Sequence, residues 1–231
     1  MQRLVLLTFL LGVILFSCSN LKNNHQGKLT VKGQVKGLRL GTLLLKKINY
    51  DSVYSIDSIK VDGKEQFEFK TELDEPQILI LELPEIKEGK ILFFAAPSDT
   101  IEIHTLLENF AVNARIKGGK QQRKWEEYKN MMQKFNDKQL DLFQAKFQAA
   151  KQSDKKLLDS ITQVADRLEK RRKLYQLNFV FNNKNLPVGA YVGYVDFYDN
   201  HKILDTIYKQ LPTEIRQSKY GQWIKKTLDK K

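Results

Sequence analysis

The chain has 231 residues, of which 42% are hydrophobic and 29% charged, and its formal net charge is +12. This composition is typical of a globular protein and excludes a disordered one. Because Cys18 is the only cysteine, the sequence also excludes a disulfide framework, a thiolate metal site and thiol redox chemistry carried out by this chain alone.

Residues 1–17 have the pattern of a secretory signal peptide. Arg3 gives a basic start, and residues 4–16 form an apolar core that is too short to span a bilayer. The junction at Ser17 and Cys18 resembles the bacterial lipobox, in which the signal is cut before the cysteine and the thiol is diacylated. This resemblance implies a lipoprotein anchored through acyl chains such as palmitate on Cys18. The alternative is a plain cleaved signal or an uncleaved helix, with Cys18 incidental.

Residues 18–27 follow as a polar segment with one charge, at Lys22, and no hydrophobic period. We expect a flexible tether here. An acidic cluster, which directs some bacterial lipoproteins to the cell surface, does not follow Cys18, and no acidic residue stands directly after it. Resemblance to other lipoproteins therefore implies the periplasmic face of the outer membrane, with the lipid bilayer as the first partner.

Residues 28–117 read as β-strands. Short apolar or alternating runs lie near residues 29–35, 43–45, 53–61, 67–69, 78–83, 91–95, 99–104 and 112–116. About eight strands at roughly 8–12-residue spacing predict an antiparallel β-sandwich or barrel. Asp62 and Gly63 separate two alternating runs and predict a hairpin, because glycine accepts a positive φ without strain.

Residues 118–231 form the predicted helical region, and Gly118 and Gly119 at its start suggest a hinge. Two long apolar stripes with three- and four-residue spacing predict a pair of antiparallel helices. The stripes contain Trp125, Tyr128, Met132, Phe135, Leu142 and Phe143, and then Leu157, Ile161, Val164, Leu168, Tyr175 and Phe179. Residues 152–154 separate the two helices and offer cap side chains. Shorter helices are expected near 188–198, 202–210 and 213–228, which makes the fold class α+β.

Five short motifs occur in a fixed order along this chain. They are Val31-x-Gly33; Asp57-Ser58 leading to Asp62-Gly63 and Phe67-x-Phe69; Pro97-x-Asp99-x-Ile101-x-Ile103; Asn185-x-Pro187-x-x-Ala190-Tyr191; and Lys219-Tyr220-Gly221. This order resembles bacterial thioredoxin-like thiol–disulfide oxidoreductase lipoproteins. In that group an N-terminal β domain of unassigned function and a helical stretch precede the thioredoxin-like domain.

The resemblance covers nearly all of the chain after Cys18, but it stops where the thioredoxin-like domain would begin, and no Cys-x-x-Cys is present. The redox activity and catalytic residues of the group therefore cannot be carried over. What the resemblance implies is an accessory module. A separate thioredoxin-like protein is then a candidate partner, and a remnant of a longer oxidoreductase is the related alternative.

The sequence predicts no catalytic, metal or cofactor site. His25, His104 and His201 have no metal-ligand spacing between them. The carboxylates of Asp57, Asp62, Glu126 and Glu127 are not placed in a shared cleft by sequence, and we expect them to be solvated. Residues 191–198 are the most aromatic segment. Tyr191, Val195 and Tyr198 share helical spacing there, which favours core packing over a ligand groove.

The densest basic run is Lys170–Lys173, which is read as a solvated helix face or a contact for anionic lipid rather than for nucleic acid. The sequence therefore predicts a non-catalytic, membrane-anchored lipoprotein that binds a partner protein or an envelope ligand. The alternatives are an accessory of a thioredoxin-like oxidoreductase and an enzyme with an unrecognised site. Cys18 is the one predicted site residue, and its role is lipidation.

Overall fold

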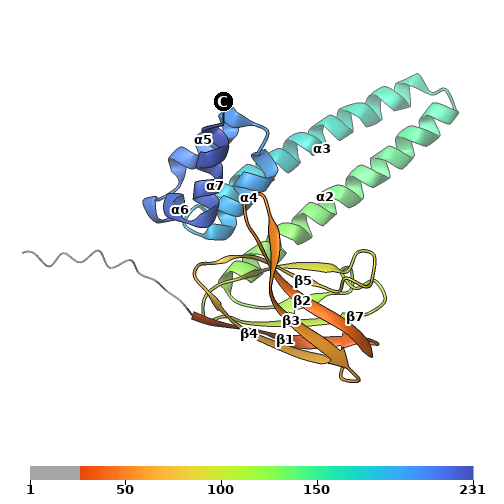
Figure 1. The fold of residues 1–231 in the computed structure, drawn as a ribbon. Coiled ribbons are helices and arrows are strands. Elements are labelled where there is room, and N and C mark those ends of the chain that lie inside the picture. Colours follow the sequence, from red (N-terminus) through yellow and green to blue (C-terminus); the bar gives the residue numbers. More distant parts are fainter. Residues whose placement is uncertain (1–26, 231) are drawn as a thin grey trace, which may run out of the picture.

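The computed structural model describes residues 27–230, so the predicted signal peptide, Cys18 and nearly all of the tether lie outside the described residues. Within residues 27–230, eight strands in two sheets precede six helices (Figure 1). The predicted α+β class is confirmed, and the strands form a sandwich of two separate sheets rather than a barrel.

Each sheet has four strands. In order across the first sheet they are β4 (Gln66–Leu73), β1 (Gly27–Lys36), β7 (Thr100–Leu106) and β8 (Arg115–Lys117). Across the second they are β3 (Val53–Asp62), β2 (Leu40–Ile48), β5 (Gln77–Glu82) and β6 (Lys90–Ala95).

One strand pair departs from the antiparallel prediction. β1 and β7 run parallel, with Thr30 opposite Thr100 and Lys36 opposite Leu106, whereas the other pairs are antiparallel. Parallel neighbours need a long crossover connection. Here the chain between β1 and β7 builds the whole second sheet and β4 before it returns to the first sheet.

The predicted hairpin at Asp62 and Gly63 is wrong. β3 and β4, which flank this turn, belong to different sheets, so the turn is a corner between the two layers. Gly63 does adopt the expected positive φ of 73°, and its N–H donates to the Arg39 carbonyl at 2.8 Å. The alternation at Phe67 and Phe69 indicates that one face of β4 is buried. It does not indicate which strand lies beside β4, so it could not test the hairpin.

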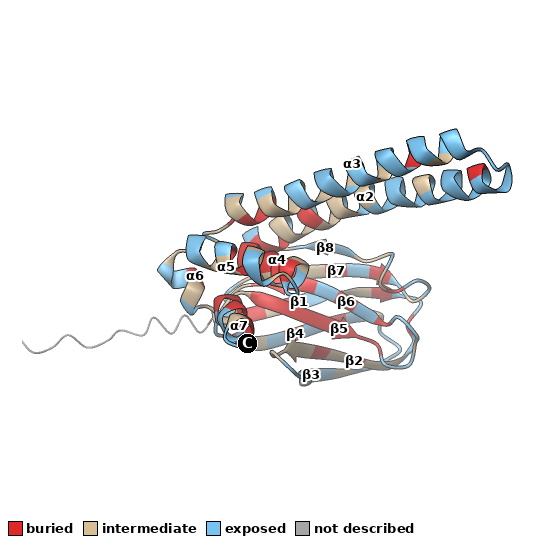
Figure 2. Ribbon diagram, turned by 90° about the horizontal axis from the view of Figure 1, so that it is seen from above, coloured by how far each residue is buried: buried red, intermediate tan, exposed pale blue. Residues whose placement is uncertain are grey.

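The sandwich core lies between the two sheets. Its large members include Leu29, Leu43, Leu45, Phe67, Phe69, Leu73, Leu79, Leu81, Phe93 and Phe110. β5 is buried at all six positions, because Leu79 and Leu81 face this core while Ile78 faces the helices (Figure 2). The second sheet is therefore the middle layer of the molecule.

Two long helices and four short ones follow the sheets within residues 27–230. They are α2 (Lys120–Lys151), α3 (Lys155–Asn182), α4 (Pro187–Phe197), α5 (His201–Gln210), α6 (Thr213–Gln217) and α7 (Lys219–Leu228). The predicted helix pair is confirmed, and Asp154 caps α3 by accepting from the Leu157 N–H at 3.0 Å. The helix predicted over 213–228 is in fact two, because Ser218 has extended backbone with ψ 166°.

The junction of sheets and helices is tightly packed, which disagrees with the predicted hinge. Gly119 is the N-cap of α2, and a Cβ on it would overlap the Asp99 carboxylate. In the first turn of α2, the buried Gln121 and Gln122 side chains accept hydrogen bonds from the backbone N–H groups of Val188 and Phe94, at 3.1 and 2.7 Å. The two glycines thus serve close approach of helix to sheet rather than flexibility.

Candidate protein-binding surface

The α2–α3 hairpin extends well beyond the rest of the molecule. Figures 1 and 2 show its distal half lying away from both sheets and from the four short helices. The start of α2 contacts β6, β8 and α4, and the end of α3 contacts α4 and α5. Among residues 27–230, the distal halves of the two helices therefore have only each other as packing partners.

The base of the hairpin is held by aromatic and polar contacts. The rings of Tyr128 on α2 and Phe179 on α3 lie 4.8 Å apart, and Tyr175 stacks on Tyr128. The Asp196 carboxylate of α4 accepts hydrogen bonds from the Tyr128 hydroxyl and from Gln176 Nε2. Burial raises the pKa of Asp196, and burial together with the neighbouring Asp196 raises the pKa of Tyr128. This cluster joins α2, α3 and α4.

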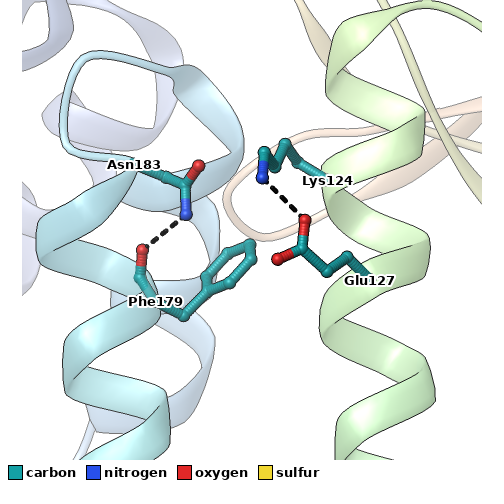
Figure 3. A network of polar contacts seen from close by, with 4 residues as sticks. All are labelled: Lys124, Glu127, Phe179 and Asn183. Carbon is teal, nitrogen blue, oxygen red and sulfur yellow. Dashed lines mark hydrogen bonds and ion pairs between the residues drawn. The ribbon is translucent and has the colours of Figure 1, made fainter.

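Local contacts also define the helix segments at this base (Figure 3). Asn183 Nδ2 donates to the Phe179 carbonyl at 2.8 Å, and the Asn183 N–H donates to the same carbonyl at 3.1 Å, so Asn183 closes the end of α3. On α2, Lys124 Nζ donates to Glu127 Oε2 at 2.6 Å. Gly189 lets α4 approach the end of α3, because a Cβ there would overlap the Asn183 carbonyl. The root of the hairpin is thus fixed to the body.

The distal half of the hairpin exposes large apolar side chains. They are Leu140, Phe143 and Phe147 on α2, and Leu157 and Val164 on α3. Leu174, nearer the root of α3, is exposed as well. Phe143, which belongs to a predicted apolar stripe, is 69% exposed. Leu157 and Val164 of the second stripe are exposed as well. In a two-helix hairpin each helix covers only one side of the other. Where an apolar stripe is wider than that side, its outer residues remain in contact with solvent.

The hairpin also carries most of the excess positive charge. α2 and α3 together contain 15 Lys and Arg residues but only seven Asp and Glu residues. Beside the seam between the helices lies a hollow of about 290 Å³, which we call the basic hollow. It is lined by Lys138, Asp141, Leu142, Val164, Arg167, Leu168 and Arg171. A second hollow of about 390 Å³ flanks the seam on its other side and shares Leu142 and Leu168 with the first.

The histidines and carboxylates considered from sequence do not form a site in the described residues. His104 lies on the outer face of the first sheet, in an open depression of about 530 Å³ that Lys32 and Glu102 also line. His201 is exposed at the start of α5. His25, like Cys18, lies outside residues 27–230. No group of three or more His, Cys, Asp or Glu side chains within residues 27–230 could hold a metal ion.

The four carboxylates have separate surroundings. Asp57 Oδ1 accepts from the Ser58 N–H at 2.7 Å, and Asp62 is exposed at the end of β3. Glu126 Oε1 accepts from Gln122 and pairs with Lys129 at 2.9 Å, and Glu127 pairs with Lys124. These contacts give the carboxylates of α2 structural and surface roles.

The aromatic segment at 191–198 is only partly a core element. Tyr191 is buried against Phe94 and Tyr220, as its spacing predicts. Val195 and Tyr198 are about half exposed, so their predicted core packing is wrong. The reason is that α4 is buried through residue 193 on all sides, whereas its last turn has neighbours on one side only.

The motif Lys219-Tyr220-Gly221 has a structural role. The Tyr220 hydroxyl accepts from the Ile78 N–H at 2.7 Å, and the Lys219 ammonium donates to the Gln77 side chain. Burial lowers the pKa of Lys219 to about 8. Gly221 leaves room for the Ile215 carbonyl, which a Cβ would overlap. The motif therefore docks α7 on β5.

Sequence reasoning missed two features. The burial of Gln121 and Gln122 was missed because polar side chains give no apolar signal. The one available sign was a pair of amides directly before the apolar stripe that begins at Trp125. The exposure of the distal hairpin was hidden because periodicity marks an apolar face without showing what covers it.

Within residues 27–230 no helix is long and apolar enough to cross a membrane.

Comparison with curated proteins gave no match. Comparison with family models gave a match over the two sheets and the first turns of α2, without a link to thioredoxin-like proteins. Residues 29–125 match the family described as a domain of unknown function (DUF4369), so the predicted β domain of unassigned function corresponds to a family of that description.

Proposed function

We propose that this chain is a lipid-anchored protein of the cell envelope, without catalytic activity of its own, whose α2–α3 hairpin binds a partner protein. The observation that carries the proposal is the projecting hairpin with six large apolar side chains in contact with solvent. Clusters of exposed apolar side chains on an otherwise polar surface are typical of interaction sites. The signal-like start and Cys18 support the anchor.

The other large open surface is a weaker candidate. The outer face of the first sheet is polar, and its charges are partly neutralised, with Lys32 paired to Glu102 at 3.3 Å. Such a face loses its hydration on binding and gains little apolar contact in return. The hairpin therefore accounts better for binding to a protein.

A thioredoxin-like protein is the first partner to test. The support for it is the ordered set of motifs that resembles lipoproteins of that group. Under this proposal the partner supplies the thiol chemistry, and this chain holds the partner at the membrane. A second copy of the hairpin is less suitable, because two such surfaces would bring together strongly positive helices.

The hairpin can be shortened without disturbing its root. Arg172 Nη1 donates to Gln139 Oε1 at 3.3 Å, so these two positions face each other across the seam. A short Gly–Ser linker joining them would replace residues 140–171 and remove five of the six exposed apolar side chains, leaving only Leu174. The root, including the Tyr128 and Phe179 rings, would remain.

The experiment compares this shortened chain with the full chain, each expressed in the source bacterium and cross-linked before purification. We expect a defined partner to be recovered with the full chain and lost with the shortened chain, while both show the same sheet signal by circular dichroism. Equal recovery with both chains would contradict binding through the hairpin.

The anchor is tested separately. Radioactive palmitate should label the wild-type chain, and the Cys18→Ser variant should be unlabelled and leave the membrane fraction. A Cys18→Ser chain that stays with the membrane would contradict the lipid anchor without affecting the hairpin.

A further inference from the structure

We propose that the partner presents an acidic amphipathic helix, which packs along the seam of the hairpin in the basic hollow. This inference rests on the proposed function, because it takes the hairpin as the binding element. It adds the kind of partner segment, the face of the hairpin that is used, and the residues that recognise it.

The floor of the basic hollow is apolar and incompletely covered. Leu142 on α2 and Val164 and Leu168 on α3 form this floor, and Val164 is 39% exposed. Val164 and Leu168 are separated by four residues and so lie one above the other on the same side of α3. Two helices that meet along such a seam leave a groove that accepts the apolar side chains of a third helix.

The rim of the basic hollow is cationic. Lys138, Arg167 and Arg171 stand around the floor, and among the described residues Asp141 is the one acidic member of the lining. Within residues 27–230 none of these three cations forms an ion pair, in contrast to Lys124 and Lys129 near the root. Arginines bind carboxylates in a bidentate manner and keep their charge at all relevant pH values. The lining therefore matches an apolar ridge flanked by Asp or Glu.

The distribution of charge argues against a membrane surface as the occupant. Leu140 follows Gln122 by five helical turns, so it lies on the same side of α2 as Gln122, which contacts β6. Leu142 lies about 200° further around the helix, on the side of the basic hollow. The protruding Leu140 and the cations of the basic hollow thus occupy different faces, whereas docking of the hollow on a flat anionic bilayer requires both on one face.

The test uses the whole chain after the predicted signal peptide, with Cys18→Ser to keep it unlipidated. A displayed library of 18-residue amphipathic helices is selected for binding, with Leu fixed on the apolar face and the flanking positions varied among Glu, Gln and Lys. We expect Glu to be enriched at the flanking positions. The most enriched peptide is then synthesised with a fluorescent label, and its Kd is measured by anisotropy.

A matched pair of variants locates the binding face. Lys138→Glu, Arg167→Glu and Arg171→Glu together should raise the Kd of the selected peptide by at least about tenfold. The control carries Lys146→Glu, Lys170→Glu and Lys173→Glu, which change the net charge equally outside the basic hollow, and its Kd should stay within about threefold of the wild type. Circular dichroism checks that both variants keep their helix content.

Three outcomes would overturn the inference. The first is that the library selection enriches Lys or Gln at the flanking positions, or enriches nothing. The second is that both triple variants raise the Kd of the selected peptide equally. The third is that no peptide is selected, while vesicles of phosphatidylglycerol and phosphatidylcholine bind and lose binding in the variant of the basic hollow. The first two remove the acidic helix as the partner class, and the third assigns the hollow to lipid. If removal of residues 140–171 still abolishes partner capture, the proposed function stands and only this inference fails. If that removal has no effect, the proposed function fails.

Discussion

The side-chain oxygen of Gln122 accepts a hydrogen bond from the backbone N–H of Phe94 at 2.7 Å, and both residues are fully buried. Phe94 belongs to β6, the edge strand of the second sheet, and Gln122 belongs to the first turn of α2. The amide nitrogen of Gln122 in turn donates to Glu126 at 2.6 Å. A helix side chain thus takes the place that a further strand would have at this edge, and it fixes the direction in which the hairpin leaves the body.

Replacing this amide should destabilise the whole protein. Gln122→Leu keeps a side chain of similar size but leaves the Phe94 N–H buried without an acceptor, so we expect the free energy of unfolding to fall by about 1–3 kcal/mol. Urea unfolding followed by circular dichroism measures the change. Gln133→Leu is the control, because Gln133 is exposed and bonds only to Asp137 within α2. A Gln122→Leu loss no larger than that of the control would contradict the role of the bond.

A second buried bond joins the helices to β5. The Tyr220 hydroxyl accepts from the Ile78 N–H, and Tyr220→Phe removes only this oxygen while it keeps the ring contacts with Tyr191 and Trp223. We expect a loss of about 1–3 kcal/mol in the free energy of unfolding. Tyr198→Phe on the exposed end of α4 should change it by less than about 0.5 kcal/mol. Similar values for the two variants would show that the Ile78 bond does not stabilise the fold.

Secondary structure was predictable here because each element has its own periodicity and its own end signals. The alternation around Val31 marks the buried face of β1, and Asp154 marks the start of α3 with a cap that the structure confirms. What the sequence did not reveal is which elements meet. The same alternation suits either sheet, so the corner at Gly63 could not be distinguished from a hairpin.

The candidate surface was partly hidden for a related reason. The spacing of Phe143 and Val164 shows that each belongs to an apolar stripe, but it does not show how many other helices pack against that stripe. The break at Ser218 was also hidden, because it depends on contacts far away in sequence, such as the Lys219 N–H donating to Glu75 at 2.8 Å. Cys18, the one site residue predicted from sequence, lies outside the described residues, and its lipidation stays a prediction.

The carboxyl of Asp196 should make stability depend on pH. Burial raises its pKa above the ordinary value of 3.8, so the folded state keeps the proton at pH values where the unfolded chain has lost it. The stability from this group is therefore present below the ordinary pKa and is lost as the pH rises through the folded value. Asp196→Asn keeps an oxygen that accepts from Tyr128 and Gln176, and it cannot ionise.

We therefore expect the free energy of unfolding of Asp196→Asn to rise relative to wild type as the pH is raised from the ordinary pKa of 3.8 toward neutral. Urea unfolding at several pH values in this range measures the difference. Asp205→Asn on the exposed face of α5, where Asp205 pairs with Lys209 at 2.7 Å, should show no such rise. A difference for Asp196→Asn that stays constant with pH would contradict a raised pKa in the folded state.

The distal hairpin should be the part of the helical region that opens most easily. Its helices bury few side chains there, chiefly Ala149 and Ile161, whereas β5 is buried at every position. Opening free energies follow local packing, so we expect amide hydrogen exchange around Phe143 and Val164 to be faster than in β5 by orders of magnitude. Mass spectrometry of peptic fragments measures both regions in one sample, and Tyr128 and Phe179 at the root should exchange slowly. Equally slow exchange at the tip would mean that the hairpin is already covered in solution, and its apolar residues would then be unavailable to a partner.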